Sequence, residues 1–416
     1  MHMKNLDATQ RVGAKNPVSR DSKELLYSLY MFKMLSLIPL VVALFVVPSS
    51  VFADACGPDI TECEETVSKT VRSNSQHYWC FAKGLKWPVE LKSLVKAEGI
   101  VSGDPHLGQF AVIPLRLIGG GRAMQFANVD FDDSGVAPFA MDFLRLAIAI
   151  KAIERDIQRN DKDVEDFTGV KGLLEAYKTG LKGKLIAPPE SIAKDLKMSP
   201  KEYDQLAQDY VEGKLSGSDK TKLSRKDSEV EAPKSSDSIT AKVAARYLPG
   251  YKVLDVVRIR KERGGSVNQD RFWVLVEGAN SVKKIFEFKG WSATALESFH
   301  KQKKPLDWAA SLYPAFWPQA ESEQYAFKKI GSRYFWIREK RKSLTDIPYE
   351  ARRKKDLNFL TEMSLFVANH LGLIHGRQTA AKGYSVLLSD EKVSEMFRQS
   401  VKEFMNQYLN KFKIKS

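Results

Sequence analysis

The sequence predicts an α+β fold with extra helices at both ends of the chain. Apolar residues recur at three- and four-residue steps in 64–97 and again in 356–413, which predicts helices in both stretches. Between them the pattern changes to short apolar runs that are typical of strands. With 416 residues, of which 43% are hydrophobic, the chain can bury one large core or two ordinary ones.

The inner elements follow from local patterns. VIPLRL (112–117) and MQFANVDF (124–131) are separated by IGGGR and predict a β-hairpin. The apolar face of MDFLRLAIAIKAIERDI (141–157) predicts a helix directly after it. The remaining expected elements are helices at 163–181 and 200–212 and strands at 251–262, 270–278 and 283–291.

Changes in composition divide the chain into five segments. They are a processing segment (1–53), a helical segment with the hairpin (54–158), a polar insertion (159–245), a β-rich segment (246–345) and C-terminal helices (346–416). Within the insertion, 216–238 is rich in Ser, Lys and Asp and is expected to be a mobile linker.

The N-terminal segment is typical of an export signal. LSLIPLVVALFVVPSSVFA (35–53) is an apolar run in which Val51 and Ala53 are placed as in an A-x-A-like cleavage site. Because the preceding residues would make an unusually long polar region, Met31 or Met34 is the expected start, and the signal spans about 31–53. A periplasmic or secreted protein with no stable membrane span after cleavage is predicted; a membrane anchor is the alternative.

Charge and cysteine content say little about partners. The net charge of +14 is spread along the chain without a nucleic-acid-binding motif, so no nucleic acid is expected as a partner. The three cysteines, Cys56, Cys63 and Cys80, suit one disulfide in an oxidising compartment with one thiol left over. Their spacing matches no zinc pattern.

Two acidic motifs carry the candidate chemistry. In VSGDPHLGQF (101–110), Asp104 could accept or orient the proton of an attacking hydroxyl. Gln109 and, in ANVDFDDSG (127–135), Asp130 could hold Mg²⁺ against phosphates, because carboxylate and amide oxygens suit that hard cation. Taken alone, such acids often only cap turns and helices.

A second region supports phosphate chemistry. Gly264, Gly265 and Ser266 lie between two expected strands, where glycines let backbone N–H groups approach phosphates. Lys289 lies in the apolar strand IFEFKGW, and a lysine there needs a partner such as a nucleotide phosphate. A plain hairpin and an edge lysine would explain each feature singly. Together with Asp104 they favour a phosphotransferase site.

The motifs also resemble a family. GDPHLGQF, VDFDDSGVAPFAMDFLRLA, GGSVNQDRFWVLVEG with EFKGW, FWIREKRK and HLGLIHGR resemble, in this order, the bacterial domain of unknown function 2252 family. The first two blocks are also similar to the catalytic core of aminoglycoside phosphotransferases and other kinase-like enzymes. The resemblance runs from about Trp79 to Arg377. Since ordinary kinases place the glycine loop and lysine first, it implies a kinase-like fold in circularly permuted order.

The resemblance also implies roles. It implies ATP and Mg²⁺ as cofactors, with the nucleotide and an unknown acceptor as partners. Asp104 matches the catalytic Asp, Asp130 the metal-binding Asp, Asp142 the Asp that braces the catalytic loop and Lys289 the lysine on the phosphates. Asp132 could serve a second metal, and Gln109 stands where the family has Asn.

Other residues and functions stay open at this stage. His106 could line the site, although a brace is the commoner role in such loops, and Arg338 could bind an anion or belong to a solvated basic face. One alternative function is a catalytically inactive kinase-like protein that binds an envelope ligand or partner. A weaker one is a metal-dependent phosphohydrolase that uses Asp104, Asp130, Asp132 and Asp133.

Overall fold

The chain folds into a mixture of helices and antiparallel strands, as the α+β expectation requires. The computed structural model describes residues 62–63, 66–160, 168–226, 229–234, 237–260, 269–291, 294–299, 302, 311–312, 314–321, 325–340, 342, 344–345, 347–348 and 354–414. The expected signal segment 1–53, Cys56 and the glycine turn Gly264–Ser266 lie outside these residues. No helix in the described ranges is both long and apolar enough to cross a membrane.

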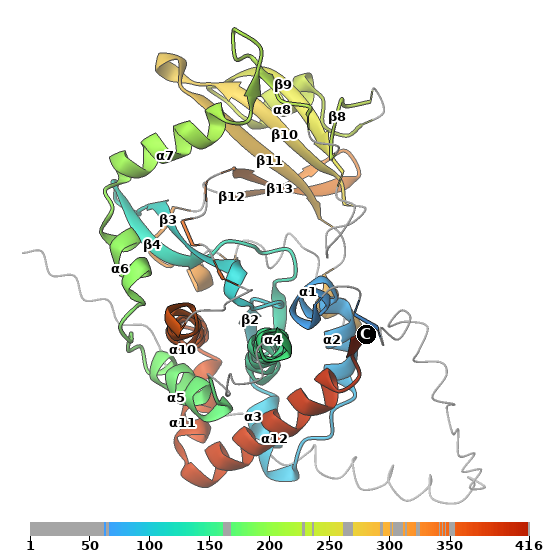
Figure 1. Ribbon diagram of the computed structural model, residues 1–416, viewed down its shortest axis with the longest axis vertical. Helices are drawn as coiled ribbons and strands as arrows, with labels where there is room; N and C mark the ends of the chain where they lie inside the picture. The colour runs from blue at the N-terminus through green and yellow to red at the C-terminus, as the bar shows by residue number, and fades with distance from the viewer. Residues whose placement is uncertain are drawn as a thin grey trace, which may run out of the picture. The chain divides into compact units, whose positions relative to one another are not determined.

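A six-stranded antiparallel sheet forms the β-rich part of the chain (Figure 1). Its strands, in spatial order, are β12 (Tyr325–Ile330), β13 (Arg333–Glu339), β11 (Lys283–Trp291), β10 (Arg271–Glu277), β9 (Lys252–Ile259) and β8 (Val230–Glu231). The predicted strands at 251–262, 270–278 and 283–291 are therefore confirmed as β9, β10 and β11.

Alternation along the strands gives the sheet two different faces. Phe272, Val274 and Phe288 pack with α8 (Ala241–Tyr247) on one face. On the other face Leu275 and Ile285 pack with residues of α7 (Pro200–Glu212). Because side chains alternate with a period of two, Glu287 and Lys289 share the second face with Ile285.

The hairpin predicted at 112–131 is confirmed. β3 (Phe110–Arg116) pairs with β4 (Arg122–Asn128) in an antiparallel register that joins Phe110 to Asn128 and Arg116 to Arg122. The other small sheets are β2 (Glu98–Val101) with β5 (Gly135–Pro138), β6 (Leu215–Ser216) with β7 (Lys222–Leu223), and β1 (Glu62–Cys63) with β14 (Lys413–Ile414).

Helices make up most of the remainder. Those not yet named are α1 (Val67–Ser73), α2 (Ser75–Lys83), α3 (Lys92–Val95), α4 (Phe139–Asn160), α5 (Val170–Leu181), α6 (Glu190–Lys197), α10 (Lys354–Gly376), α11 (Ala381–Ser389) and α12 (Glu391–Leu409). Short 3₁₀ turns are η2 (Val89–Leu91), η3 (Leu107–Gln109), η4 (Ala279–Ser281) and η5 (Ala295–Ser298). The helices predicted at 141–157, 163–181 and 200–212 appear as α4, α5 and α7.

Part of the segment expected to be a bare mobile linker, 216–238, takes on regular structure. Leu223 in β7 is buried against the α7 face of the sheet, and its N–H donates to the Asp255 carboxylate at 2.9 Å. Arg225 pairs with the same carboxylate at 3.0 Å. The Leu223 side chain and the Asp255 carboxylate on β9 therefore hold residues 223–225 against the sheet. The polar composition of 216–238 does not reveal these contacts.

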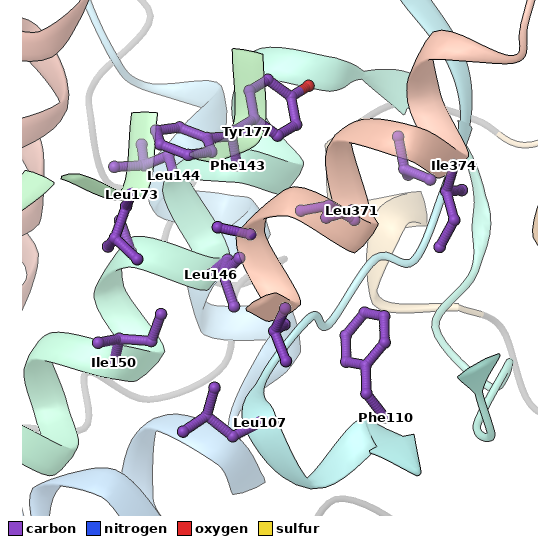
Figure 2. Packing of buried hydrophobic residues seen from close by; sticks show 14 of the residues in the cluster. Leu107, Phe110, Phe143, Leu144, Leu146, Ile150, Leu173, Tyr177, Leu371 and Ile374 are labelled. Carbon is purple, nitrogen blue, oxygen red and sulfur yellow. The ribbon is translucent and has the colours of Figure 1, made fainter. Parts of the chain in front are cut away.

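The largest core surrounds α4. Its buried residues Phe143, Leu146 and Ile150 meet side chains of α5 and α10, and Leu107 and Phe110 join the same cluster from the other side (Figure 2). Both of these are almost completely buried, at 0% and 1% exposure. The motif 101–110 is consequently anchored on the core by apolar side chains at its C-terminal end.

Helices α5 and α10 approach closely because glycines line their contact. A Cβ added to Gly180 would lie 1.9 Å from the carbonyl oxygen of Asn369, and one added to Gly372 would lie 2.2 Å from that of Tyr177. Such distances are far below van der Waals contact, so these positions require glycine.

Substitution by alanine should therefore change the free energy of unfolding in opposite directions at two helical glycines, Gly372 and Gly383. Gly372→Ala forces α5 and α10 apart and should lower the free energy of unfolding by about 2 kcal/mol. Gly383→Ala in α11, where a new Cβ meets nothing within 4 Å, should raise it by about 0.5 kcal/mol. Urea unfolding of both variants measures this, and shifts of the same sign would refute close packing at Gly372.

Candidate functional site

A single buried carboxylate holds the Gly-Asp-Pro-His turn. Asp142, in the first turn of α4, accepts the backbone N–H groups of Ser102 and Gly103 at 3.0 and 2.9 Å. His375 of α10 lies 3.1 Å from the same carboxylate through Nε2. Asp142 thus holds the turn through two backbone N–H groups, and His375 is a buried partner of the same carboxylate.

Gly103 brings the turn against the second acidic motif. Its φ of +80° is in the left-handed region, and an added Cβ would lie 1.7 Å from the carbonyl oxygen of Asp133. The indole Nε1 of Trp79 donates to the Gly103 carbonyl at 2.7 Å. Only glycine satisfies both the conformation and the contact.

A polar relay ties the turn to the end of the hairpin. The Asn128 amide donates to Ser102 Oγ at 2.8 Å, and Ser102 Oγ lies 3.2 Å from Gln109 Oε1, to which it donates. The Gln109 carbonyl accepts the N–H of Val129 at 2.8 Å. Gln109, expected as a metal ligand, therefore has its side-chain oxygen in a hydrogen bond to Ser102 of the same motif. The bonds from Asn128 and from the Val129 N–H join this motif to the second acidic motif.

Asp104 forms a buried ion pair with a residue that sequence reasoning missed. Arg145 of α4 donates to Asp104 Oδ1 from Nε at 2.8 Å and from Nη2 at 2.6 Å. Burial raises the pKa of Asp104 to about 7, although Arg145 favours its ionised form. Asp142 and Arg145 are charged residues three positions apart in the otherwise apolar first half of α4 (139–150), and that spacing was the available signal.

His106 lies next to Asp104 but is no strong proton carrier. Its Nε2 is 4.0 Å from Asp104 Oδ2. Burial, together with the nearby Arg72 and Arg145 charges, holds the pKa of His106 well below its usual range, so the ring is neutral. A neutral ring argues against an acid or base role, and the buried Nδ1 atom has no hydrogen-bond partner among the described residues that would make His106 a brace.

Lys289 meets the acidic motif from the other half of the chain. Its Nζ lies 3.4 Å from Asp130 Oδ1 and 3.5 Å from Oδ2, and it also pairs with Asp132. Burial lowers the pKa of Lys289 to about 8. Although burial opposes ionisation of Asp130, the charges of Lys289, Arg338 and Arg271 bring its pKa down to about 2. The two carboxylate side chains keep 33% and 21% of their surface exposed, while Lys289 keeps 3%.

A second buried carboxylate organises the sheet beneath Lys289. Glu287, fully buried two residues before Lys289, accepts from Arg271 at 3.2 Å and from Arg338 Nε at 2.7 Å. Despite burial, Arg338, Lys340 and Arg271 lower its pKa to about 2. Glu287 and Arg271 were missed by sequence reasoning, although a charge at every second position of an apolar strand signals one polar patch on a sheet face.

Arg338 joins the sheet to the acidic motif. Besides its two bonds to Glu287, it donates from Nη1 to the carbonyl of Val129 at 2.6 Å. Val129 directly precedes Asp130, so this arginine positions the motif. Its guanidinium is committed to protein groups rather than presented to an anion.

The expected phosphate-binding residues Gly264, Gly265 and Ser266 lie outside the described residues. In sequence they fall between β9 and β10, and β10 begins with Arg271 paired directly opposite Lys289. The described residues just before β10 consequently lie beside Lys289. No group of three or more His, Cys, Asp or Glu side chains suited to a metal occurs in the described parts of the chain.

Cys80 of α2 is disulfide-bonded, as an oxidising compartment allows. Its partner must be Cys56 or Cys63, whose side chains lie outside the described residues.

Removing the Glu287 charge should strongly destabilise the sheet. Glu287→Gln leaves buried arginines without a counter-ion and should cost about 3 kcal/mol in the free energy of unfolding. Because the Glu287 pKa lies below its ordinary value of 4.5, its contribution is present above that pH and is lost as the pH falls toward 2. The difference in the free energy of unfolding between wild type and variant should accordingly become smaller below pH 4.5, as urea unfolding at several pH values measures.

The matched control is Glu212→Gln. Glu212 also pairs with a cation, Lys220 at 2.7 Å, but both side chains are about half exposed, at 45% and 53%. Its substitution should leave the urea midpoint unchanged. Equal effects of the two substitutions would show that burial of Glu287 contributes nothing.

No family model, no curated protein and no solved structure matches this chain. The case for its function rests on the contact of Lys289 with Asp130 and Asp132, and on Asp104, which lies near enough to Asp130 for that charge to raise the pKa of Asp104.

Proposed function

We propose that this chain is an exported kinase-like phosphotransferase, with its parts in permuted order, that transfers phosphate from ATP to a hydroxyl of an unknown acceptor. One observation carries the proposal: Lys289 Nζ lies 3.4 Å from Asp130 although 159 residues separate them in sequence. Phosphoryl transfer requires a cation for the phosphates and carboxylates for a metal within one nucleotide's reach. These residues meet that requirement.

The carboxylates fit magnesium. Asp130 and Asp132 are partly exposed, and the low pKa of Asp130 keeps it ionised at neutral pH. Magnesium commonly uses one or two protein carboxylates and completes its shell with water and substrate phosphates. When bound, it would neutralise charge on the phosphates.

The remaining roles belong to the chain itself. Lys289 would exchange its pairing with Asp130 and Asp132 for contact with phosphate oxygens. Asp104 would receive the acceptor proton on Oδ2, since Arg145 occupies Oδ1. A pKa near 7 is close to the optimum for such a base.

A second candidate is an inactive kinase-like protein that binds a nucleotide or an envelope ligand. Two observations favour it: Gln109 Oε1 accepts from Ser102, and Arg145 holds Asp104 Oδ1. This candidate shares the binding chemistry and lacks turnover, so binding and catalysis must be measured separately.

Asp130→Ala tests the metal site. It should weaken magnesium-dependent ATP binding by roughly tenfold or more, since loss of even an indirect metal partner commonly costs that much. Calorimetry of the wild type and the variant, each with and without Mg²⁺, measures the change. Asp209→Ala, which removes an exposed carboxylate on α7, is the control and should bind as the wild type does. Unchanged binding by Asp130→Ala would end the metal assignment.

The proposal also predicts a bell-shaped pH dependence. Below pH 7 Asp104 is protonated and cannot accept a proton, and above pH 8 Lys289 loses the charge that binds phosphate. The kcat/KM for phosphate release from ATP should therefore peak between pH 7 and 8. ATP affinity should fall only on the alkaline side, because Asp130 stays ionised throughout. Binding without any phosphate release would favour the inactive protein instead.

A further inference from the structure

A cavity of about 550 Å³ lies away from the Asp104 and Lys289 site. Helix α7 packs against β4 on one side and β11 on the other, and the cavity is lined by these elements (Figure 1). Its rim includes Asn280 and Ser281 from the turn that joins β10 to β11. A cavity of this size accommodates a small organic ligand.

The lining is strongly basic. Its described residues include two acidic side chains, Asp204 and Glu339. Against these stand six cations, which are Arg116, Arg122, Lys201, Lys283, Lys284 and Lys340. Like charges held around one concave surface raise the local potential and attract anions.

The two acids of the lining are already neutralised. Asp204 receives a two-point ion pair from Arg122, with distances of 2.7 and 2.8 Å, and Glu339 pairs with Lys284 at 3.3 Å. The other four cations therefore determine the charge of the cavity.

None of the described partners of those four cations is an acidic residue of the lining. Arg116 reaches Glu321 at 3.7 Å, a distant and partly exposed pair, and Lys283 donates to two backbone carbonyls. Lys340 lies 4.0 Å from Glu287, which two arginines already neutralise. Lys201 is exposed at the start of α7.

We propose that this cavity binds a small polyanion, a molecule with two or more phosphate or carboxylate groups. The four cations come from different parts of the fold, namely β3, α7, β11 and the residue after β13. Such cations suit a ligand with several anionic groups better than a ligand with one, because each cation can contact the oxygen atoms of a different group. The polar side chains of Gln205, Gln208 and Asn280 supply hydrogen bonds for the uncharged part of such a ligand. The site does not depend on the proposed phosphotransferase activity.

The test uses citrate and tripolyphosphate as probes, titrated calorimetrically at low salt into the full chain after divalent cations have been removed with a chelating resin. Without a divalent cation, the Asp104 site exposes carboxylates that repel polyanions. Both probes should bind the wild type with one site, and affinity should fall as salt is added. A double variant, Arg116→Gln with Lys201→Gln, should bind about tenfold more weakly, since it removes two charge-assisted contacts.

The matched control is Arg260→Gln with Lys92→Gln. Arg260 pairs with Glu231 at 3.7 Å, as Arg116 does with Glu321, and Lys92 is exposed like Lys201. This control removes the same number of positive charges outside the cavity, so the affinity for both probes should be unchanged. Equal weakening in both double variants would show non-specific charge attraction and overturn the proposal, as would failure of both probes to bind the wild type.

Discussion

The geometry of the candidate site depends on the Asp142 carboxylate. It accepts two consecutive backbone N–H groups of the Gly-Asp-Pro-His turn and contacts His375, and all of these groups are buried. Buried N–H groups without an acceptor would each cost on the order of 1 to 3 kcal/mol, so the turn has one favourable position. Because Asp142 lies in the first turn of a long helix of the main core, the position of Asp104 is tied to the largest buried cluster of the chain.

Two buried carboxylates, those of Asp142 and Glu287, thus each accept hydrogen bonds that hold one half of the candidate site. Asp142 holds backbone donors on the side of Asp104, whereas Glu287 holds arginine side chains on the side of Lys289. Arg338 connects the two halves because it binds Glu287 and the carbonyl before Asp130. Loss of either carboxylate would remove hydrogen bonds that hold the segments carrying Asp104 and Asp130.

Sequence patterns predicted the elements better than their connections. Alternation and helical spacing correctly indicated the β3–β4 hairpin, β9 to β11 and α4, because burial of one face produces those periods. The contact of Lys289 with Asp130 was expected because both residue types suit phosphate chemistry, but no local pattern encodes a contact across 159 residues. Arg145, Glu287 and Arg271 were missed because a buried charge reveals its partner only in the folded chain. Gln109 was read as a ligand from its type, whereas its place beside Ser102 is a tertiary property.

The parallel pairing of β1 with β14 has a consequence for how this protein could be rebuilt. Glu62 lies opposite Lys413, so the first and last described strands are neighbours. A peptide long enough to return from the end of β14 to the start of β1 could join them, since parallel strands need a longer connection than antiparallel ones. New termini could then be opened at the exposed residues 217–220, which precede the buried Leu223. Such a rearranged chain would place Lys289 before the Asp104 turn in sequence, so the order of the segments along the chain is separable from the fold that they assemble.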